Sequence, residues 1–182
     1  MRFLASILAA ILGVGLMAAD ADAQDKRNLI YMDLKDGRVV IETKPDIAPK
    51  HVARIKELVK QGFYNGVVFH RVIAGFMAQG GDPTGTGMGG SGKKIPAEFS
   101  STKHVRGTLS MARAADPNSA DSQFFICFGP TPNLDGQYTV WGQVIQGMEF
   151  VDKIKKGSPA ENGKVQNPDK IVKMQLAEDA KD

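Results

Sequence analysis

The stretch from Val67 to Pro83, VVFHRVIAGFMAQGGDP, constrains the fold more than any other part of this 182-residue chain. Its apolar residues include the β-branched pair Val72 and Ile73, which favour extended backbone. Gly75 allows a bend, and Gly80-Gly81 ends the apolar run. The pattern predicts a strand, a kink and a second short strand.

Two polar side chains, Arg71 and Gln79, lie within this apolar frame. An arginine on an apolar strand either extends its charged end into water or is directed at a ligand. A phenyl ring and a thioether follow within a few positions, at Phe76 and Met77. We therefore interpret Arg71 as part of a binding site, and the alternative is a solvated arginine on the outer face.

The rest of the mature chain is typical of short strands with a helix near each end. Asp36-Gly37 between two apolar runs predicts a β-hairpin. Helical spacing predicts helices over residues 48–61 and 148–154, with His51 on the exposed side of the first. Strands are further expected at residues 29–34, 39–41, 108–113, 124–126, 138–144 and 171–176. Short strands without βαβ alternation predict one mainly all-β domain, residues 24–182, with a closed or sandwiched antiparallel sheet.

Composition and motifs argue against several functions. The chain is 42% hydrophobic, enough for one core, and its net charge is +3 with no basic block that would indicate nucleic-acid binding. The glycine-rich segment 82–94 matches phosphate-binding patterns in part, but no helix-period segment follows, so we expect a surface loop. Cys127 is the only cysteine and is expected to be a buried hydrophobe. Metal-ligand spacing does not occur.

The first 23 residues predict a cleaved secretory signal peptide. Arg2 supplies a positive charge, residues 3–19 are apolar or small, and Ala21-Asp22-Ala23 supplies an A-x-A cleavage site. The alternative is an uncleaved membrane anchor, although the run falls just short of the usual spanning length. We expect a periplasmic protein with no stable membrane insertion after signal cleavage.

Three stretches together carry a resemblance: Phe69–Asp82 (FHRVIAGFMAQGGD), Gly107–Arg113 (GTLSMAR) and Ser122–Cys127 (SQFFIC). They are similar to the cyclophilins, the cyclophilin-type peptidyl-prolyl cis-trans isomerases. The resemblance implies a closed eight-stranded antiparallel β-barrel capped by two α-helices. It also implies a monomeric, cofactor-free enzyme that accelerates rotation about X-Pro bonds. Together with the expected signal peptide, this predicts an enzyme that assists the folding of exported proteins. The alternative function is a chaperone or scaffold that binds proline-containing segments with little turnover.

The resemblance also implies a set of site residues. Arg71 resembles the family's catalytic arginine, and no residue resembles a cofactor or metal ligand. The partners implied are proline-containing polypeptide clients, held by residues that resemble a proline pocket, groove amides and a pairing strand edge: Phe76, Met77, Gln79, Ala112, Arg113, Ala114, Gln123, Phe125, Leu134 and Tyr138. Because isomerisation transfers no proton to solvent, His70 and His104 are expected to be structural.

Asn133 departs from the family, because animal cyclophilins commonly carry a tryptophan at the matching position. The indole donor that helps to bind cyclosporin is then absent, so we expect weak cyclosporin binding. Titration of cyclosporin into an isomerase assay should give no inhibition in the nanomolar range, and nanomolar inhibition would contradict this prediction. Tyr138 and Arg113 replace a common histidine and asparagine, but we expect activity to survive because an aromatic wall and the backbone contacts are kept.

Overall fold

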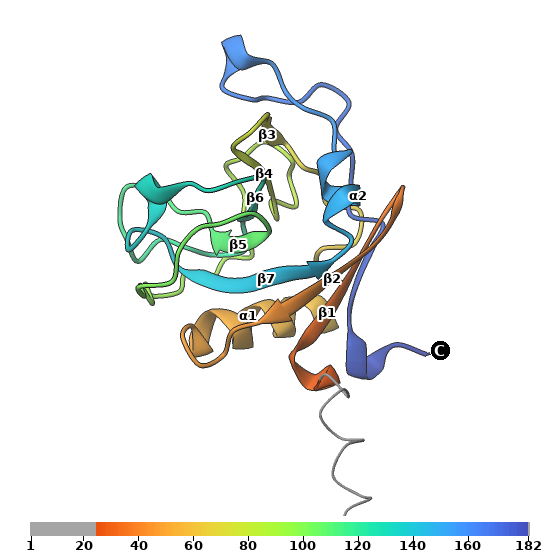
Figure 1. The fold of residues 1–182 in the computed structure, drawn as a ribbon, viewed down its shortest axis with the longest axis vertical. Coiled ribbons are helices and arrows are strands. Elements are labelled where there is room, and N and C mark those ends of the chain that lie inside the picture. The colour runs from red at the N-terminus through yellow and green to blue at the C-terminus, as the bar shows by residue number, and fades with distance from the viewer. Residues whose placement is uncertain (1–24, 182) are drawn as a thin grey trace, which may run out of the picture.

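The computed structural model describes residues 25–181, so the expected signal peptide at residues 1–23 lies outside the described residues. In the described part, eight strands form one antiparallel sheet in the order β3-β4-β6-β5-β7-β2-β1-β8, which confirms the expected mainly-β fold (Figure 1). The strands are β1 (Leu29–Leu34), β2 (Gly37–Thr43), β3 (Arg71–Ile73), β4 (Met77–Gly80), β5 (Thr108–Met111), β6 (Phe124–Cys127), β7 (Val140–Gln146) and β8 (Lys173–Leu176).

The sheet forms a half-barrel, so the expectation of a closed barrel was too strong. β3 and β8 stand at opposite ends of the strand order, and no strand pairing joins them within residues 25–181. Irregular backbone spans the gap instead: Ile171 N–H donates to Val67 O at 2.9 Å, and Val68 and Lys170 form an isolated antiparallel bridge. The segment before β8 therefore supplies hydrogen bonds without adopting a regular strand.

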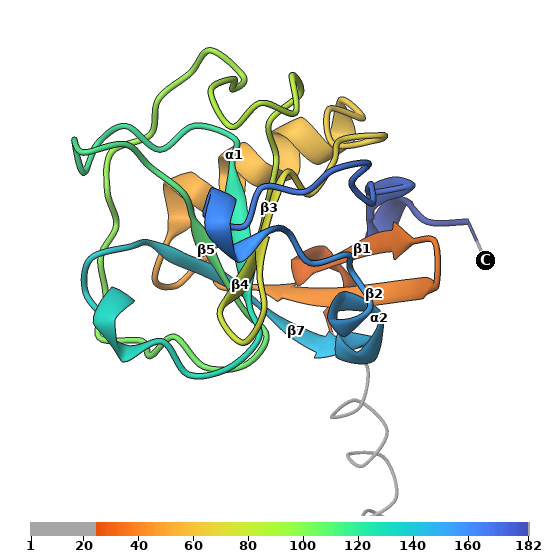
Figure 2. The same cartoon turned by 90° about the horizontal axis from the view of Figure 1, so that it is seen from above.

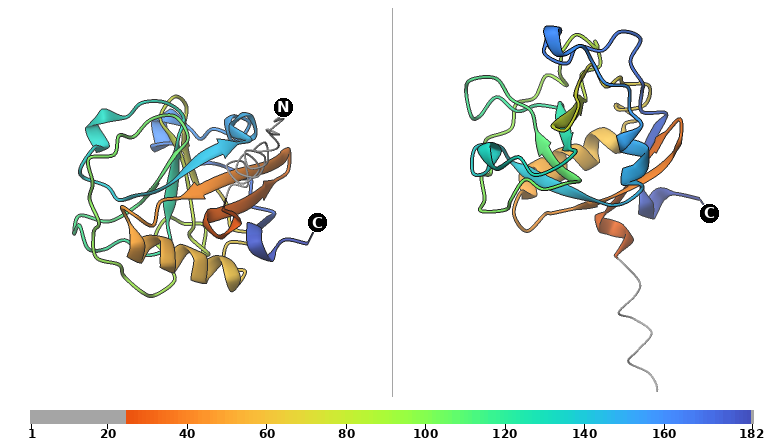
Figure 3. Two further views of the ribbon diagram at one scale, coloured as in Figure 1. Left: turned by 60° about the horizontal axis from the view of Figure 1, so that its bottom comes forward. Right: turned by 45° about the horizontal axis from the view of Figure 1, so that its top comes forward.

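Among residues 25–181, two α-helices cover the sheet, as expected. α1 (Pro49–Lys60) begins with a proline in its first turn and lies below β7, β2 and β1 in Figure 1. Its apolar stripe, which includes Val52, Ile55 and Leu58, is buried, and the helix contacts β8 and β7. α2 (Met148–Asp152) is shorter than expected and contacts β2. Figure 3 shows the two helices on opposite sides of the β1–β2 hairpin.

The expected exposed position of His51 in α1 is wrong, because the residue is fully buried. Glu98, from the loop before β5, covers the start of the helix. Its carboxylate accepts hydrogen bonds from the Lys50 and His51 N–H groups at 3.1 and 3.0 Å and lies 2.6 Å from His51 Nδ1. The helix has no side-chain cap at Ala48, so a residue distant in sequence satisfies its first N–H groups.

The core lies between the curved sheet and α1. The rings of Tyr64, Phe124 and Trp141 pack edge to face there, with centroid separations of 5.6 and 5.8 Å along that series. Tyr64 also donates a hydrogen bond to Ser122 O at 3.0 Å. These contacts fix β6 and β7 against the segment that precedes β3. Cys127 is buried, as expected, but on the other face of β6.

The glycine-rich segment after β4 is a surface loop, as expected (Figure 2). It is built around the buried carboxylate of Asp82. This carboxylate accepts hydrogen bonds from the N–H and hydroxyl of Thr84 and from the N–H groups of Gly87 and Gly89, at 2.6–3.1 Å. Burial alone would raise the pKa of Asp82, but these hydrogen bonds outweigh it and lower the pKa to about 2. The N–H groups of the loop thus bind the carboxylate of Asp82, an anion that the chain itself supplies.

Replacing Asp82 tests this account of the loop. A carboxyl group whose pKa falls from 3.8 to about 2 on folding stabilises the fold by about 2 kcal/mol above pH 4, and the contribution is lost as the pH falls toward 2. Asp82→Asn should therefore lower the free energy of unfolding by about 1–3 kcal/mol at pH 7. Urea unfolding should show the difference from wild type shrinking below pH 4.

The control for this prediction is Asp46→Asn, which removes an exposed carboxylate. Its free energy of unfolding should match that of wild type both at pH 7 and below pH 4. Equal stability of Asp82→Asn and wild type at pH 7 would mean that the carboxylate does not organise the loop.

Candidate active site

Strands β4 and β6 bury side chains on both of their faces, and this creates the site. Successive side chains of a strand point to opposite faces. β4 and β6 are paired so that Met77 lies opposite Cys127 and Gln79 lies opposite Phe125. The residues between them join the main core, whereas Met77, Phe125 and Cys127 join Leu134 in a second apolar cluster. The second cluster therefore lies on the outer face of the half-barrel.

An apolar hollow of about 120 Å³ lies at this cluster. The rings of Phe125 and Tyr138 meet edge to face at 5.8 Å, and the Arg113 guanidinium lies 4.6 Å from the centre of the Tyr138 ring. The volume is far below the roughly 300–1,000 Å³ of drug-sized and cofactor pockets, so the hollow suits one small ring or side chain. Its lining residues are Arg71, Phe76, Met77, Gln79, Ala112, Arg113, Phe125, Leu134 and Tyr138.

Arg71 begins β3 and lies directly across the hairpin from Gln79. Gly75, with φ of 73°, makes the expected bend between the two strands. Directly opposite residues project to the same side of an antiparallel pair, and Arg71 Nη1 donates to Gln79 Oε1 at 3.1 Å. Burial lowers the pKa of Arg71, yet an arginine stays charged throughout the physiological range. A cation therefore stands on the wall of an apolar hollow.

Asn162 contacts the same guanidinium from the other side. Arg71 Nε donates to Asn162 O at 3.0 Å, and Arg71 Nη2 donates to Asn162 Oδ1 at 3.0 Å. Sequence reasoning missed this residue. Asn162-Gly163 is a turn signal, but nothing in the local sequence indicates that the turn reaches a strand about ninety positions away. In Figures 1 and 3 the segment that carries it lies beside β3.

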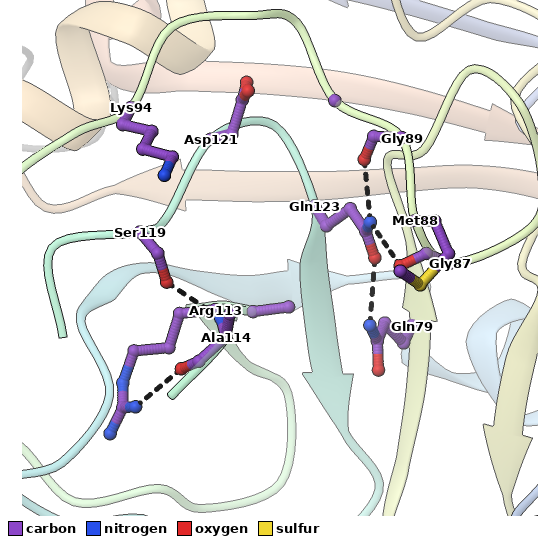
Figure 4. A pocket seen from close by; sticks show the side chains of 12 residues that line it. Gln79, Gly87, Met88, Gly89, Lys94, Arg113, Ala114, Ser119, Asp121 and Gln123 are labelled. Carbon is purple, nitrogen blue, oxygen red and sulfur yellow. Dashed lines mark hydrogen bonds between the residues drawn. The ribbon is translucent and has the colours of Figure 1, made fainter. Parts of the chain in front are cut away.

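A second hollow, a groove of about 440 Å³, adjoins the first and shares Gln79, Ala112 and Arg113 with it. Gln123 lies on its wall between Gln79 and the glycine-rich loop (Figure 4). Gln79 Nε2 donates to Gln123 Oε1 at 3.0 Å, and Gln123 Nε2 donates to the carbonyls of Gly87 and Gly89 at 3.0 and 2.8 Å. Hydrogen bonds thus connect the loop to Arg71 through two amides.

The segment Ala112–Ala114, expected to pair with a client backbone, runs between the two hollows just after β5. The Ala112 N–H donates to Gln123 O at 3.0 Å, and the Ala114 N–H donates to Ser119 Oγ at 2.9 Å. The Arg113 N–H has no hydrogen-bond partner among residues 25–181. Only part of the expected edge is therefore available to a client. The Arg113 side chain is held by the Gln137 and Ala114 carbonyls and covers Tyr138.

Neither histidine near the site lines either hollow. His104 is fully shielded: its Nδ1 lies 3.1 Å from Asp135 Oδ1, its Nε2 lies 3.0 Å from Ser110 Oγ, and its ring stacks on Phe125 at 6.2 Å. His104 thus supports the floor of the hollow through its neighbours. The His70 side chain is also buried, and its two ring nitrogens have no hydrogen-bond partner in the described chain. Burial lowers the pKa of His70.

Every residue expected at the site from the sequence lines one of the two hollows, including Ala114 and Gln123 in the groove. Their roles toward a substrate stay predictions. The groove is also lined by Met88, Lys94, Ser119 and other residues of the two loops, which the sequence did not single out as site residues. Within residues 25–181, no group of His, Cys, Asp and Glu side chains could hold a metal ion, and no helix is long and apolar enough to cross a membrane.

The model of the family described as cyclophilin type peptidyl-prolyl cis-trans isomerase/CLD matches residues 29–176. A probable peptidyl-prolyl cis-trans isomerase from Brucella abortus is 54% identical over 196 aligned positions, which cover all of both chains. A cyclophilin structure from Hirschia baltica matches with a TM-score of 0.77 and 29% identity, over 86% of this chain and 76% of that one. A cyclophilin-type isomerase structure from Cryptosporidium parvum matches with a TM-score of 0.74 and 32% identity, over 81% and 98%. The chain therefore belongs to the cyclophilin-type peptidyl-prolyl cis-trans isomerases.

Proposed function

We propose that Arg71 is the catalytic group of this isomerase and that the apolar hollow beside it holds the ring of the substrate proline. One observation carries the proposal: a charged guanidinium lines a small hollow whose other walls are largely apolar or aromatic. Three of its N–H donors are used by Gln79 and Asn162. The remaining donors have no partner in the described chain, so they are available to a ligand in the hollow.

The chemistry of the reaction suits such a group. Resonance gives the peptide C–N bond double-bond character and a rotation barrier of about 18–20 kcal/mol. When the X-Pro bond is half rotated, conjugation is broken and the prolyl nitrogen carries a lone pair. Arg71 can donate a hydrogen bond to that lone pair. The planar ground state cannot accept this hydrogen bond, because there the lone pair is delocalised into the amide. An interaction made only in the transition state accelerates the reaction.

The surroundings of Arg71 favour the same step. Apolar walls exclude water, and a hydrogen bond from a cation is stronger where the local dielectric is low. We propose that Gln79, Gln123 and the Arg113 backbone hold the client chain beside the hollow while the bond turns. The Cryptosporidium parvum relative was crystallised in the presence of the dipeptide Ala-Pro. We propose the same class of ligand here, as an X-Pro unit within a longer polypeptide.

We further propose that the enzyme acts on exported proteins in the periplasm. The basis is the sequence of the first 23 residues, with its charge, apolar run and A-x-A site. Proteins that leave the cytoplasm unfolded refold after export, and X-Pro isomerisation, at tens to hundreds of seconds, is slow enough to limit that refolding. A periplasmic isomerase would therefore act where its substrate class is abundant.

Substitution of Arg71 tests the catalytic role. Arg71→Ala should reduce kcat/KM on a short X-Pro peptide by roughly a hundredfold to a thousandfold, because one preorganised donor of this kind contributes about 2.7–4 kcal/mol. Arg71→Lys should recover only part of the rate, because lysine lacks the planar fork. The melting temperature of each variant should stay within a few degrees of wild type.

Arg27→Ala is the matched control, since the Arg27 side chain is highly exposed and, among the described residues, forms hydrogen bonds only with Asp25. It should retain full activity. Wild-type activity in Arg71→Ala would contradict the catalytic assignment. A chain that binds proline peptides tightly without accelerating their isomerisation would instead be a binding protein, which is the alternative function.

Expression of the full chain in a Gram-negative host tests the export proposal. Cleavage at the A-x-A site should give a periplasmic protein that begins at Gln24, as measured by intact mass after osmotic release. Ala23→Arg should block processing and raise the mass, because signal peptidase requires a small residue there. Full-length protein in the cytoplasm or in the membrane pellet would contradict the proposal.

A further inference from the structure

Besides Gln79, which accepts one hydrogen bond from the Arg71 guanidinium, Asn162 accepts two. Asn162 presents two acceptors from one residue: its backbone carbonyl takes Nε and its side-chain Oδ1 takes Nη2, both at 3.0 Å. Two parallel N–H···O bonds to adjacent nitrogens fix the plane of a guanidinium as well as its position. Asn162 is exposed and lines neither hollow, so it is placed to act on Arg71 and not on a substrate.

The loop that carries Asn162 is locked onto β3. Val72 N–H donates to Gly163 O at 2.8 Å, and Arg71 and Lys164 form an isolated antiparallel bridge. A Cβ on Gly163 would lie 2.4 Å from Ile73 Cγ1, so the loop approaches the strand as closely as a glycine permits. Asn162 is therefore held at a fixed distance from the first residue of β3.

The backbone conformation selects asparagine at this position. Asn162 has φ of 53°, in the left-handed region where asparagine is several-fold enriched over other non-glycine residues. Glycine would adopt the same conformation without the side-chain oxygen. An aspartate would also tolerate it, but its charge would pair with the cation. Asparagine combines the required backbone with an uncharged acceptor, so it orients Arg71 without neutralising it.

We propose that Asn162 is a positioning residue: its two oxygens hold the Arg71 guanidinium so that the remaining N–H donors face the apolar hollow. The proposal rests on the catalytic role of Arg71 proposed above. It predicts that Asn162 acts on the rate of the chemical step. Because Asn162 does not line the hollow, the affinity for a proline-containing peptide should not depend on it.

Asn162→Gly tests the proposal, because it keeps the left-handed backbone and the carbonyl, and of the two acceptors that contact Arg71 it removes only Oδ1. We expect kcat to fall about three- to tenfold, the effect of one lost hydrogen bond, with KM unchanged. Line-shape analysis of peptide exchange by NMR separates the two constants. Asn167→Gly is the matched control: Asn167 is also exposed, has φ of 51° and does not contact Arg71, so this variant should keep wild-type kcat.

The Arg71 Nη–H signals in the ¹⁵N NMR spectrum, assigned by their absence from Arg71→Ala, give a readout of orientation, because Asn162 Oδ1 accepts from Nη2. They should be resolved and slow to exchange in wild type and in Asn162→Asp, and broadened in Asn162→Gly, because the variant frees Nη2 to rotate. In an Arg71→Lys background, Asn162→Gly should change kcat by less than about twofold, because the fork that it orients is gone.

Equal kcat in Asn162→Gly and Asn167→Gly, alongside an inactive Arg71→Ala, would overturn the positioning role and leave the catalytic role intact. Full activity in Arg71→Ala would instead overturn the catalytic role on which it rests. A fall in kcat that persists undiminished in the Arg71→Lys background would also overturn the proposal, because Asn162 would then act through another route.

Discussion

The alternation of side chains along β4 and β6 is the constraint on which the site depends. One face of these strands completes the main core, and the other bears Met77, Gln79 and Phe125. A shift of one residue in the pairing would turn every one of these side chains to the opposite face. The aromatic packing that fixes β6 in the core therefore also fixes the composition of the apolar hollow. The register between β4 and β6 therefore determines both the packing of the main core and the lining of the apolar hollow.

A connected set of hydrogen bonds gives the hollow its polar edge. It begins at the buried Asp82 carboxylate, passes through the backbone of Gly87 and Gly89 to Gln123, and continues through Gln79 to Arg71. Asn162 completes it from the other side of the guanidinium. Apart from Asp82, every acceptor in the set is neutral. The guanidinium of Arg71 is therefore oriented by neutral dipoles, and no carboxylate of this set contacts it.

Much of this architecture follows from local sequence pattern. Residues that are neighbours along the chain determine some elements, so periodicity and turn chemistry predict them. These elements are the hairpin at Asp36-Gly37, the bend at Gly75 and helix α1. The contact of Glu98 with the start of α1 and that of Asn162 with Arg71 join residues far apart in sequence. Each depends on where a loop folds in space, and no local signal encodes it. For the same reason, His51 is buried against expectation, and the sheet stops short of closing.

The incomplete closure of the sheet has a consequence for aggregation. An exposed strand edge invites other polypeptides to extend the sheet, which leads to aggregation. Here the backbone of residues 163–171 already occupies much of the hydrogen-bonding capacity beside β3. This edge of the sheet therefore offers few unpaired N–H and C=O groups to which another extended chain could add a strand.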